Sequence, residues 1–255
     1  MAHLDINFLS NALNRNVDIK LILPTKTAWT LENKYEAKTN TFYQDKKDMK
    51  YPLLILLHGY TGSLQQWLGF TRAEMYAEEN NIAIVTVSGE NKWFINTEYD
   101  KYYDFIEYEL KDFLYGNFPI SKERSDNYIA GLSMGGFGAL YHALSNPLAY
   151  NKVGAFSPAL YPKAKSLLKG NEIEELTLSN KDNLPNIYFS IGDKDFLLDD
   201  TNKYSKFLDK NNIKYEYSLV EGYSHEWRFW DMELEKFIKS LDRTDEAYKH
   251  APKGG

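Results

Sequence analysis

The sequence predicts an α/β protein with a mostly parallel central sheet and helices on both of its faces. Strand-like and helix-like segments alternate along the 255 residues, which is typical of a wound sheet with right-handed crossovers. Leu53–Leu57 and Ile82–Val87 are apolar at nearly every position, as expected of strands that helices cover on both sides. No repeat or linker interrupts the alternation, so we expect residues 1–255 to form a single domain.

The first expected strand, Asn16–Leu23, alternates polar and apolar residues and is followed by Pro24, which indicates a half-buried strand. Thr25–Lys50 comes next and is polar, so we interpret it as a solvated loop. The later expected strands are short and mainly apolar. They are Leu53–Leu57, Ile82–Val87, Tyr128–Ala130, Val153–Phe156, Ile187–Ile191 and Tyr215–Val220.

Helical patterns fill the intervals between these strands. The expected helices are Arg72–Glu79, Tyr102–Phe113, Phe137–Ser145, Thr201–Lys210 and Trp227–Leu241. In the last of them Trp230, Leu234 and Phe237 fall three or four residues apart, on one helix face. Asp242–Gly255 contains a proline and two terminal glycines, and we expect this segment to be a flexible tail.

The composition excludes several classes of protein. Asp and Glu outnumber Lys and Arg by 36 to 30, and the resulting charge of −6 disfavours a nonspecific nucleic-acid binder. The 20 Tyr, 14 Phe and 5 Trp supply more apolar burial than a disordered chain contains. The absence of cysteine excludes disulfides, thiol nucleophiles, zinc–thiolate sites and iron–sulfur clusters.

The sequence also bears on location and partners. Met1–Ile6 shows no basic stretch followed by an apolar one, so we recognise no secretory signal. The longest apolar run, Leu53–Leu57, is far too short to span a bilayer. We therefore expect a cytoplasmic protein that binds neither nucleic acid nor membrane. The sequence does not decide the oligomeric state, and a homo-oligomer is one option.

The strongest chemical signal is the G-x-S-x-G motif at Gly131–Gly135, with Ser133 at its centre. It follows the expected strand Tyr128–Ala130 and precedes a helix, which is the context of a nucleophile elbow. A sharp strand-to-helix turn leaves no room for neighbouring Cβ atoms, which explains the glycines. We therefore predict that Ser133 is a nucleophile.

A serine hydroxyl needs a base to remove its proton, and elimination leaves His225 for that role. The other four histidines are poorly placed: His3, His58, His142 and His250. Two of these lie near the chain ends. His142 follows Ser133 by nine residues on the same expected helix, about 13 Å away by helical rise. His225 instead lies in the loop before the last helix.

The acid that orients the imidazole should follow a late strand and precede the histidine. Asp195 meets this requirement after Ile187–Ile191. Asp193 is the alternative, but we expect it rather to hold the turn through its own backbone. The two aspartates resemble the start of an EF-hand loop, but Leu197 and Leu198 stand where that loop needs a ligand and a glycine. We therefore expect no metal and no cofactor.

An oxyanion hole requires two backbone N–H groups that point at the developing charge. Met134 follows the nucleophile at a helix N-terminus and is one predicted donor. The loop His58–Gly62 follows the strand Leu53–Leu57, and Tyr60 within it is the other predicted donor. We interpret His58 as a brace of this loop rather than as a base.

Aromatic residues gather in the loops that this fold would bring to one end of the sheet. We name Trp67, Trp93 and Trp227 as candidate substrate contacts, although each could equally pack in the core or at its rim. Together they indicate an apolar acyl or aryl pocket. No long insertion resembles the lid of an interfacial lipase.

These motifs make the chain resemble the α/β-hydrolase esterases of the esterase D group, and most of all bacterial tributyrin esterases. The resemblance is carried by Asn11–Pro24, Leu56–Trp67, Gly131–Gly138, Gly192–Leu197 and His225–Phe237. It implies Ser133, Asp195 and His225 as a catalytic triad and Tyr60 as an oxyanion donor. It also implies carboxylesterase activity on short acyl chains. The chain lacks the cysteine motif that many S-formylglutathione hydrolases carry near the oxyanion loop.

The sequence therefore predicts a serine carboxylesterase that hydrolyses acetyl to butyryl esters through an acyl-enzyme. The alternatives are an S-formylglutathione-type thioesterase, an acyltransferase, or a feruloyl or acetylxylan esterase, all using the same machinery. A non-catalytic binding protein with this fold is the alternative from a different class. It has no need of the complete Ser, Asp and His set, which disfavours it.

Overall fold

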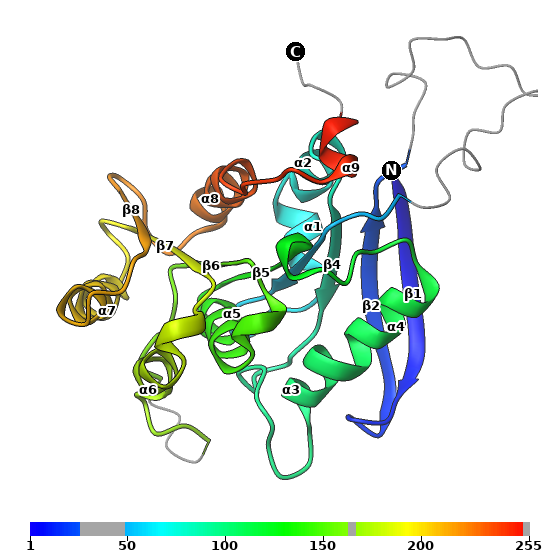
Figure 1. Cartoon of the computed structure of the whole chain (residues 1–255). Helices are drawn as coiled ribbons and strands as arrows, with labels where there is room; N and C mark the ends of the chain where they lie inside the picture. The colour runs from blue at the N-terminus through cyan, green and yellow to red at the C-terminus, as the bar shows by residue number, and fades with distance from the viewer. Residues whose placement is uncertain (26–48, 163–166, 252–255) are drawn as a thin grey trace, which may run out of the picture.

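A computed structural model describes residues 1–25, 49–162 and 167–251, and its strands form one sheet (Figure 1). The sheet has eight strands in the order β1-β2-β4-β3-β5-β6-β7-β8. The strands are β1 (Ala2–Ser10), β2 (Arg15–Leu23), β3 (Leu53–Leu57), β4 (Ala83–Val87), β5 (Asn127–Leu132), β6 (Lys152–Phe156), β7 (Asn186–Gly192) and β8 (Glu216–Val220). Strands β3 to β8 are parallel, and the hairpin β1–β2 joins β4 in antiparallel orientation. The predicted mostly parallel sheet is confirmed.

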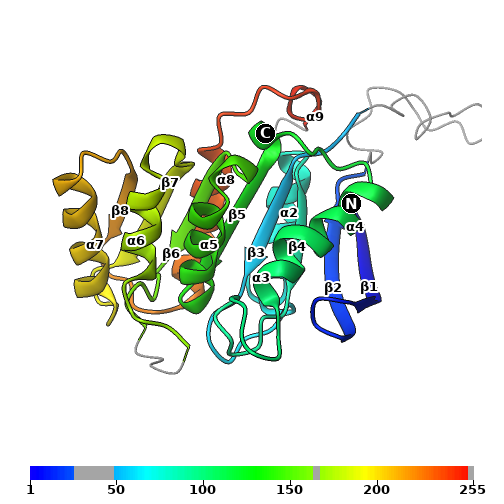
Figure 2. The same ribbon diagram turned by 60° about the horizontal axis from the view of Figure 1, so that its bottom comes forward.

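The register aligns the carboxyl ends of the parallel strands at one edge of the sheet. Leu57, the last residue of β3, lies opposite Val87 of β4 on one side and Gly131 of β5 on the other. At the far side, Gly192 of β7 lies opposite Val220 of β8. The loops that follow these strands therefore meet along one edge, the lower edge in Figure 2. Ligand sites of open α/β sheets form at this edge.

Helices cover both faces of the sheet (Figure 1). On one face lie α1 (Gln66–Phe70), α2 (Ala73–Glu79) and α8 (Trp227–Lys239). On the other face lie α3 (Tyr102–Asp104), α4 (Lys111–Asn117), α5 (Met134–Ser145), α6 (Glu172–Ser179) and α7 (Leu198–Lys210). A short helix, α9 (Glu246–Lys249), follows α8, and Phe105–Leu110 between α3 and α4 forms a π-helix.

This layering explains the apolar strands. Every residue of β3 and β4 is buried. Along β3, Leu53 and Ile55 point into the core beneath α4 and α5, whereas Leu54 points into the core beneath α2 and α8. Each strand therefore contributes to two hydrophobic cores, and neither face can carry a polar residue without a partner.

The structure adds elements that the sequence analysis did not predict. Strand β1 was missed, and so were α1, α6 and α9. The prediction of a flexible tail from Asp242 is wrong for residues 243–251. Arg243 is buried, binds Asp245 at 2.7 Å and donates to the Asn80 carbonyl, while Ala247 of α9 is fully buried. Most of the expected polar loop, residues 26–48, lies outside the described residues, as do 163–166 and 252–255.

Candidate active site

Ser133 occupies a sharp turn between β5 and α5. Its backbone has φ 54° and ψ −117°, a combination of angles that residues other than glycine rarely adopt. A Cβ at Gly131 would lie 2.2 Å from the Gly135 carbonyl oxygen, and a Cβ at Gly135 would lie 2.2 Å from that of Leu57. The glycines of the motif are therefore required by backbone contacts, and the predicted elbow is present.

Hydrogen bonds from the neighbouring strand hold this strained turn. The Ser133 N–H donates to the Phe156 carbonyl of β6 at 2.9 Å. The Ser133 carbonyl accepts from the N–H groups of Phe137 and Ala159 at 3.1 and 3.0 Å. Met134 begins α5 directly afterwards, where the first amides of a helix have no acceptor within it. The elbow thus presents a serine at the positive end of a helix dipole.

His225 and Asp195 meet at the same edge of the sheet. His225 Nδ1 lies 2.8 Å from Asp195 Oδ2, and the other carboxylate oxygen accepts the Leu197 N–H at 2.9 Å. Burial raises the pKa of Asp195, but the hydrogen bonds from His225 and Leu197 outweigh it, so the pKa lies below its ordinary value. An ionised carboxylate can only accept a hydrogen bond, so Nδ1 carries the ring proton and donates it in this bond, which leaves Nε2 as the acceptor nitrogen of the ring. Among the described residues, none hydrogen-bonds to Nε2.

Asp193 has a different contact. Its carboxylate accepts the Gly222 N–H at 2.7 Å, and the adjacent Lys194 N–H donates to the Tyr223 carbonyl at 3.0 Å. These bonds join the loop after β7 to the loop that carries His225. Asp193 therefore holds the turn through a side-chain bond to a second loop, and not only through its own backbone as expected, while Asp195 reaches the imidazole.

Ser157, the residue after β6, supports Asp195, and no sequence motif indicated this role. It is fully buried and has a left-handed backbone with φ 44°. Its hydroxyl accepts the Trp230 indole N–H at 3.1 Å and lies near enough to Asp195 to help lower the pKa of that carboxyl. Only the residue that follows, Pro158, marks this position as a turn in the sequence.

The loop after β3 is fixed by His58. The Gly89 N–H donates to His58 Nε2 at 2.9 Å, so the ring proton lies on Nδ1, which donates to the Gly59 carbonyl at 2.7 Å. Burial lowers the pKa of His58, which favours this neutral form. With both nitrogens occupied, His58 braces the loop and cannot accept a proton from Ser133.

This loop passes directly beside the elbow. A Cβ at Gly59 would lie 2.6 Å from Leu132 Cδ1 and 3.4 Å from Ser133 Cβ, so the backbone of this loop runs close to the elbow. The next residue, Tyr60, has a side chain that is 57% exposed. Tyr60 therefore directly follows the residue that approaches Ser133, and most of its own surface is exposed.

The loop after β4 is hydrogen-bonded to the loop after β3. The side-chain oxygen of Asn91 accepts the Thr61 N–H at 2.7 Å. Glu90, Trp93 and Phe94 in this loop all have positive φ, at 48°, 58° and 59°. Because such angles are unfavourable for these residue types, tertiary contacts must impose them. Nothing in the sequence predicted the role of Asn91 or this loop shape.

The three candidate tryptophans lie in different surroundings. Trp67 is fully buried, and its indole N–H donates to the Leu57 carbonyl at 3.0 Å. Its ring packs against that of Trp227 and has no exposed surface for a substrate. Trp227 is half-buried between Trp67 and Phe70. Trp93 is half-buried, and its ring centre lies 5.4 Å from that of Phe137.

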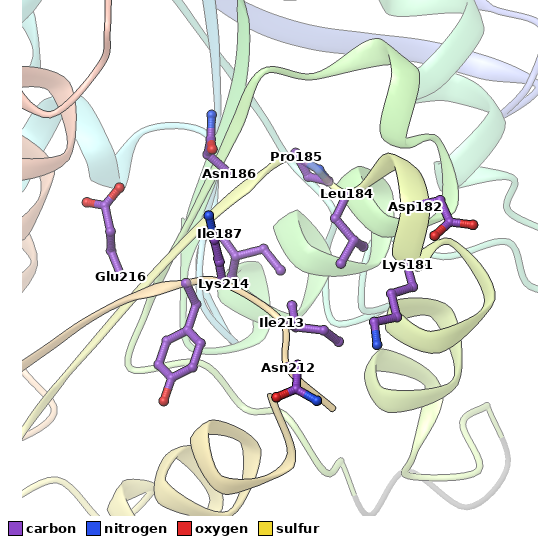
Figure 3. Close-up of a pocket in the computed structure, with 11 residues that line it drawn as sticks. Lys181, Asp182, Leu184, Pro185, Asn186, Ile187, Asn212, Ile213, Lys214 and Glu216 are labelled. Atoms are coloured by element: carbon purple, nitrogen blue, oxygen red, sulfur yellow. The ribbon is translucent and has the colours of Figure 1, made fainter. Parts of the chain in front are cut away.

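A pocket of about 330 Å³ lies away from these residues (Figure 3). Asn186, the first residue of β7, and Glu216, the first of β8, contribute to its wall. It therefore opens at the amino ends of the strands, the edge opposite Ser133. Its lining mixes Lys181 and Lys214 with Asp182 and Glu216, and none of the predicted site residues lines it.

The described residues contain no group of three or more His, Cys, Asp or Glu side chains that could hold a metal ion. Within the same ranges, no helix is long and apolar enough to cross a membrane. The expectation of a metal-free reaction stays a prediction.

The sheet, its flanking helices and the serine elbow after β5 define an α/β hydrolase. A family model described as "Putative esterase" matches residues 10–244. The chain is also 30% identical over 278 residues to an acetyl esterase of Caldicellulosiruptor saccharolyticus, covering 96% of this chain and all of that one. The chain therefore belongs to this esterase family and is a hydrolase of carboxylic esters.

Solved structures share the fold. The serine hydrolase FphF of Staphylococcus aureus has a TM-score of 0.80 at 23% identity, covering 95% of this chain and 99% of that one. The S-formylglutathione hydrolase FrmB of the same organism has a TM-score of 0.78 at 24% identity, covering 94% and 98%. These similarities extend along nearly the whole of each chain.

Proposed function

We propose that this esterase hydrolyses short-chain acyl esters, acetyl to butyryl, with Ser133 as nucleophile, His225 as base and Asp195 as the acid that orients the base. The observation that carries the proposal is the 2.8 Å contact between His225 Nδ1 and Asp195, which leaves Nε2 free to accept a proton. The strained backbone of Ser133 supports the assignment of the nucleophile.

The reaction follows from these groups. Ser133 Oγ attacks the ester carbonyl and its proton passes to His225 Nε2, while Asp195 stabilises the imidazolium. The N–H groups of Tyr60 and Met134 bind the oxyanion. His225 then donates its proton to the departing alcohol. In the second half, His225 takes a proton from water as the water oxygen attacks the acyl carbonyl, and it returns that proton to Ser133 Oγ as the bond between Oγ and the acid breaks.

Two observations support a short acyl group. The acetyl esterase relative is similar along its full length. In addition, Trp93 lies in the loop after β4 and Trp227 begins α8 two residues after His225, and both are only half-buried, so their bulky side chains are candidates to limit the depth of a pocket at this edge of the sheet. Each buried methylene stabilises a bound acyl chain by only about 0.8 kcal/mol, so a shallow pocket soon loses this gain.

The test is a series of p-nitrophenyl esters from acetyl to decanoyl, with Ser133→Ala as the background. We expect kcat/KM to be highest at acetyl to butyryl and to fall sharply by octanoyl. A flat series, or a maximum at decanoyl, would contradict the short-acyl proposal. S-formylglutathione and methyl ferulate belong in the same panel, because preference for either would replace the proposed substrate class.

A further inference from the structure

Phe196 is an exposed aromatic residue in contact with the proposed catalytic histidine. It directly follows Asp195, and 76% of its surface is exposed. Its ring centre lies 4.7 Å from that of His225, with the planes inclined by 49°. The edge of Trp230 meets the same imidazole at 4.9 Å, and that ring is buried. The imidazole therefore has one aromatic neighbour in the core and one open to solvent.

The backbone on both sides of Phe196 is fixed. The Leu197 N–H donates to the Asp195 carboxylate at 2.9 Å, and the Leu198 N–H donates to the Asp195 carbonyl at 3.1 Å. The Asp195 N–H in turn donates to the Gly192 carbonyl at 3.2 Å. Phe196 is thus presented from a tight turn, and little ordering is needed before its ring can bind a ligand.

The chemistry decides which part of an ester would meet this ring. When the tetrahedral intermediate collapses, His225 Nε2 gives its proton to the oxygen of the departing alcohol. That oxygen must come within hydrogen-bond distance of the imidazole, which brings the alcohol portion within reach of the Phe196 ring on the same imidazole. The acyl carbonyl instead lies against Ser133 and the oxyanion donors.

We propose that Phe196 forms the wall of a subsite for the alcohol portion of the ester, and that this subsite favours alcohols that carry a ring with an apolar face, aromatic or pyranose. The inference rests on the proposed function of Ser133 and His225. An exposed phenyl face attracts such a ring by stacking and by removal of apolar area from water. A short alkyl alcohol covers too little of the face to benefit.

Three acetate esters of primary alcohols test this preference: ethyl acetate, benzyl acetate and methyl 6-O-acetylglucopyranoside. They share one acyl group, so differences in kcat/KM report on the alcohol portion. We expect the native enzyme to favour a ring ester over ethyl acetate. Phe196→Ala should lower the ratio of kcat/KM for that ring ester to ethyl acetate about tenfold. The two ring esters then show whether an aromatic or a sugar ring is the better ligand.

Phe70→Ala is the matched control. Phe70 is also an exposed phenylalanine, but its ring packs on Trp227 rather than on His225. Its removal should leave the ranking of the three acetates unchanged. Phe196→Tyr keeps the ring and should restore the ratio that Phe196→Ala loses.

The rate of deacylation distinguishes an alcohol subsite from a merely structural role of Phe196, because a structural defect would slow acylation and deacylation alike. All three substrates give the same acetyl-enzyme, and the alcohol has left before water attacks. The loss in Phe196→Ala should therefore be larger in kcat/KM for the ring ester than in the deacylation rate constant, measured after the burst with p-nitrophenyl acetate. Equal losses for all three esters and for deacylation would overturn the subsite. If the native enzyme hydrolyses no ester at all, the proposed function fails first.

Discussion

Two histidine–carboxylate pairs in this molecule have the same contact distance and opposite surroundings. His225 Nδ1 lies 2.8 Å from Asp195, and His142 Nδ1 lies 2.8 Å from Glu107. His225 retains 20% of its side-chain surface, whereas neither His142 nor Glu107 is exposed at all. Distance alone would nominate both pairs for catalysis.

The second ring nitrogen separates them. His142 Nε2 lies 2.8 Å from the Phe94 carbonyl, which can only accept a hydrogen bond. Glu107 accepts from Lys111, Asn146 and Tyr150 as well as from His142. Both nitrogens of His142 therefore donate, and neither can take a proton from a substrate. The comparison teaches that a catalytic base is recognised by the nitrogen it leaves free.

The buried pair has a structural task of its own. Phe94 is one of three residues with positive φ in the loop after β4, and His142 holds its carbonyl. The same loop supplies Asn91, which binds the Thr61 N–H beside Tyr60. The pair thus lies beneath the loops that border Ser133 without taking part in proton transfer.

The largest expected effect separates the two histidines directly. His225→Ala should lower kcat by a factor on the order of 10⁴ or more, because no other described group can accept the Ser133 proton. The variant should keep its melting temperature within a few degrees, since His225 is partly exposed. Steady-state hydrolysis of p-nitrophenyl acetate measures the first quantity and calorimetry the second. A smaller loss than that of His142→Gln would reverse the comparison.

The second prediction concerns the two aspartates of one turn. Asp195→Asn should lower kcat by a factor of about 10³ to 10⁴ with KM little changed, because the amide favours the wrong tautomer of His225. Asp193→Asn should cost far less, since it weakens only the bond to Gly222. If Asp193→Asn showed the larger loss, the acid would have to be reassigned.

The third prediction concerns the buried pair. His142→Gln should destabilise the fold by about 3 to 5 kcal/mol, because it leaves the Glu107 carboxylate without one of its charged partners. Turnover per folded molecule should fall less than tenfold. Urea unfolding and active-site titration provide the two numbers. A catalytic loss as large as that of His225→Ala, in a stably folded protein, would give His142 a chemical role.

Acid should weaken the same pair. Burial raises the pKa of Glu107, but His142 and Lys111 lower it by more, so that the pKa is about 2 against an ordinary value of 4.5. A carboxyl with a depressed folded-state pKa contributes stability above its unfolded pKa and loses it as the pH falls toward the folded value. The loss should therefore occur between pH 4.5 and about 2. Stability of Glu107→Gln should depend less steeply on pH across this range; an equal slope would contradict the assignment.

The smallest expected effect is that of chelation. The proposed reaction uses only protein groups, so dialysis against EDTA should leave hydrolysis of p-nitrophenyl acetate unchanged. The control is a dialysis against buffer alone. A loss of activity that is reversed by adding one particular divalent ion would reveal a catalytic metal.

The parallel strands were predictable because burial on both faces leaves a continuous apolar run, as in Leu53–Leu57. Strand β1 was missed because it lies at the edge, where every second residue faces solvent and the pattern is weak. The docked segment at Arg243 was missed because its partners are carbonyls of residues 80 and 81, more than 160 positions away. Local sequence carries no record of such contacts.

The site shows the same division. The elbow is a local strand–turn–helix motif, so the pattern around Ser133 revealed it, although Gly135 is also required by the backbone of β3. The pairing of His225 with Asp195 was predicted from chain order, although the choice against Asp193 depends on the path of a turn. Ser157, Asn91 and Phe196 could not be found, because their importance arises only when separate loops meet.

The most direct test of the central claim is covalent labelling of the native protein by a fluorophosphonate, followed by peptide mass spectrometry. We expect a single adduct on Ser133. We also expect no labelling of a folded Ser133→Ala protein and strongly slowed labelling of His225→Ala, in contrast to near-normal labelling of His142→Gln. An adduct on another serine, or labelling that persists in folded Ser133→Ala, would contradict the claim.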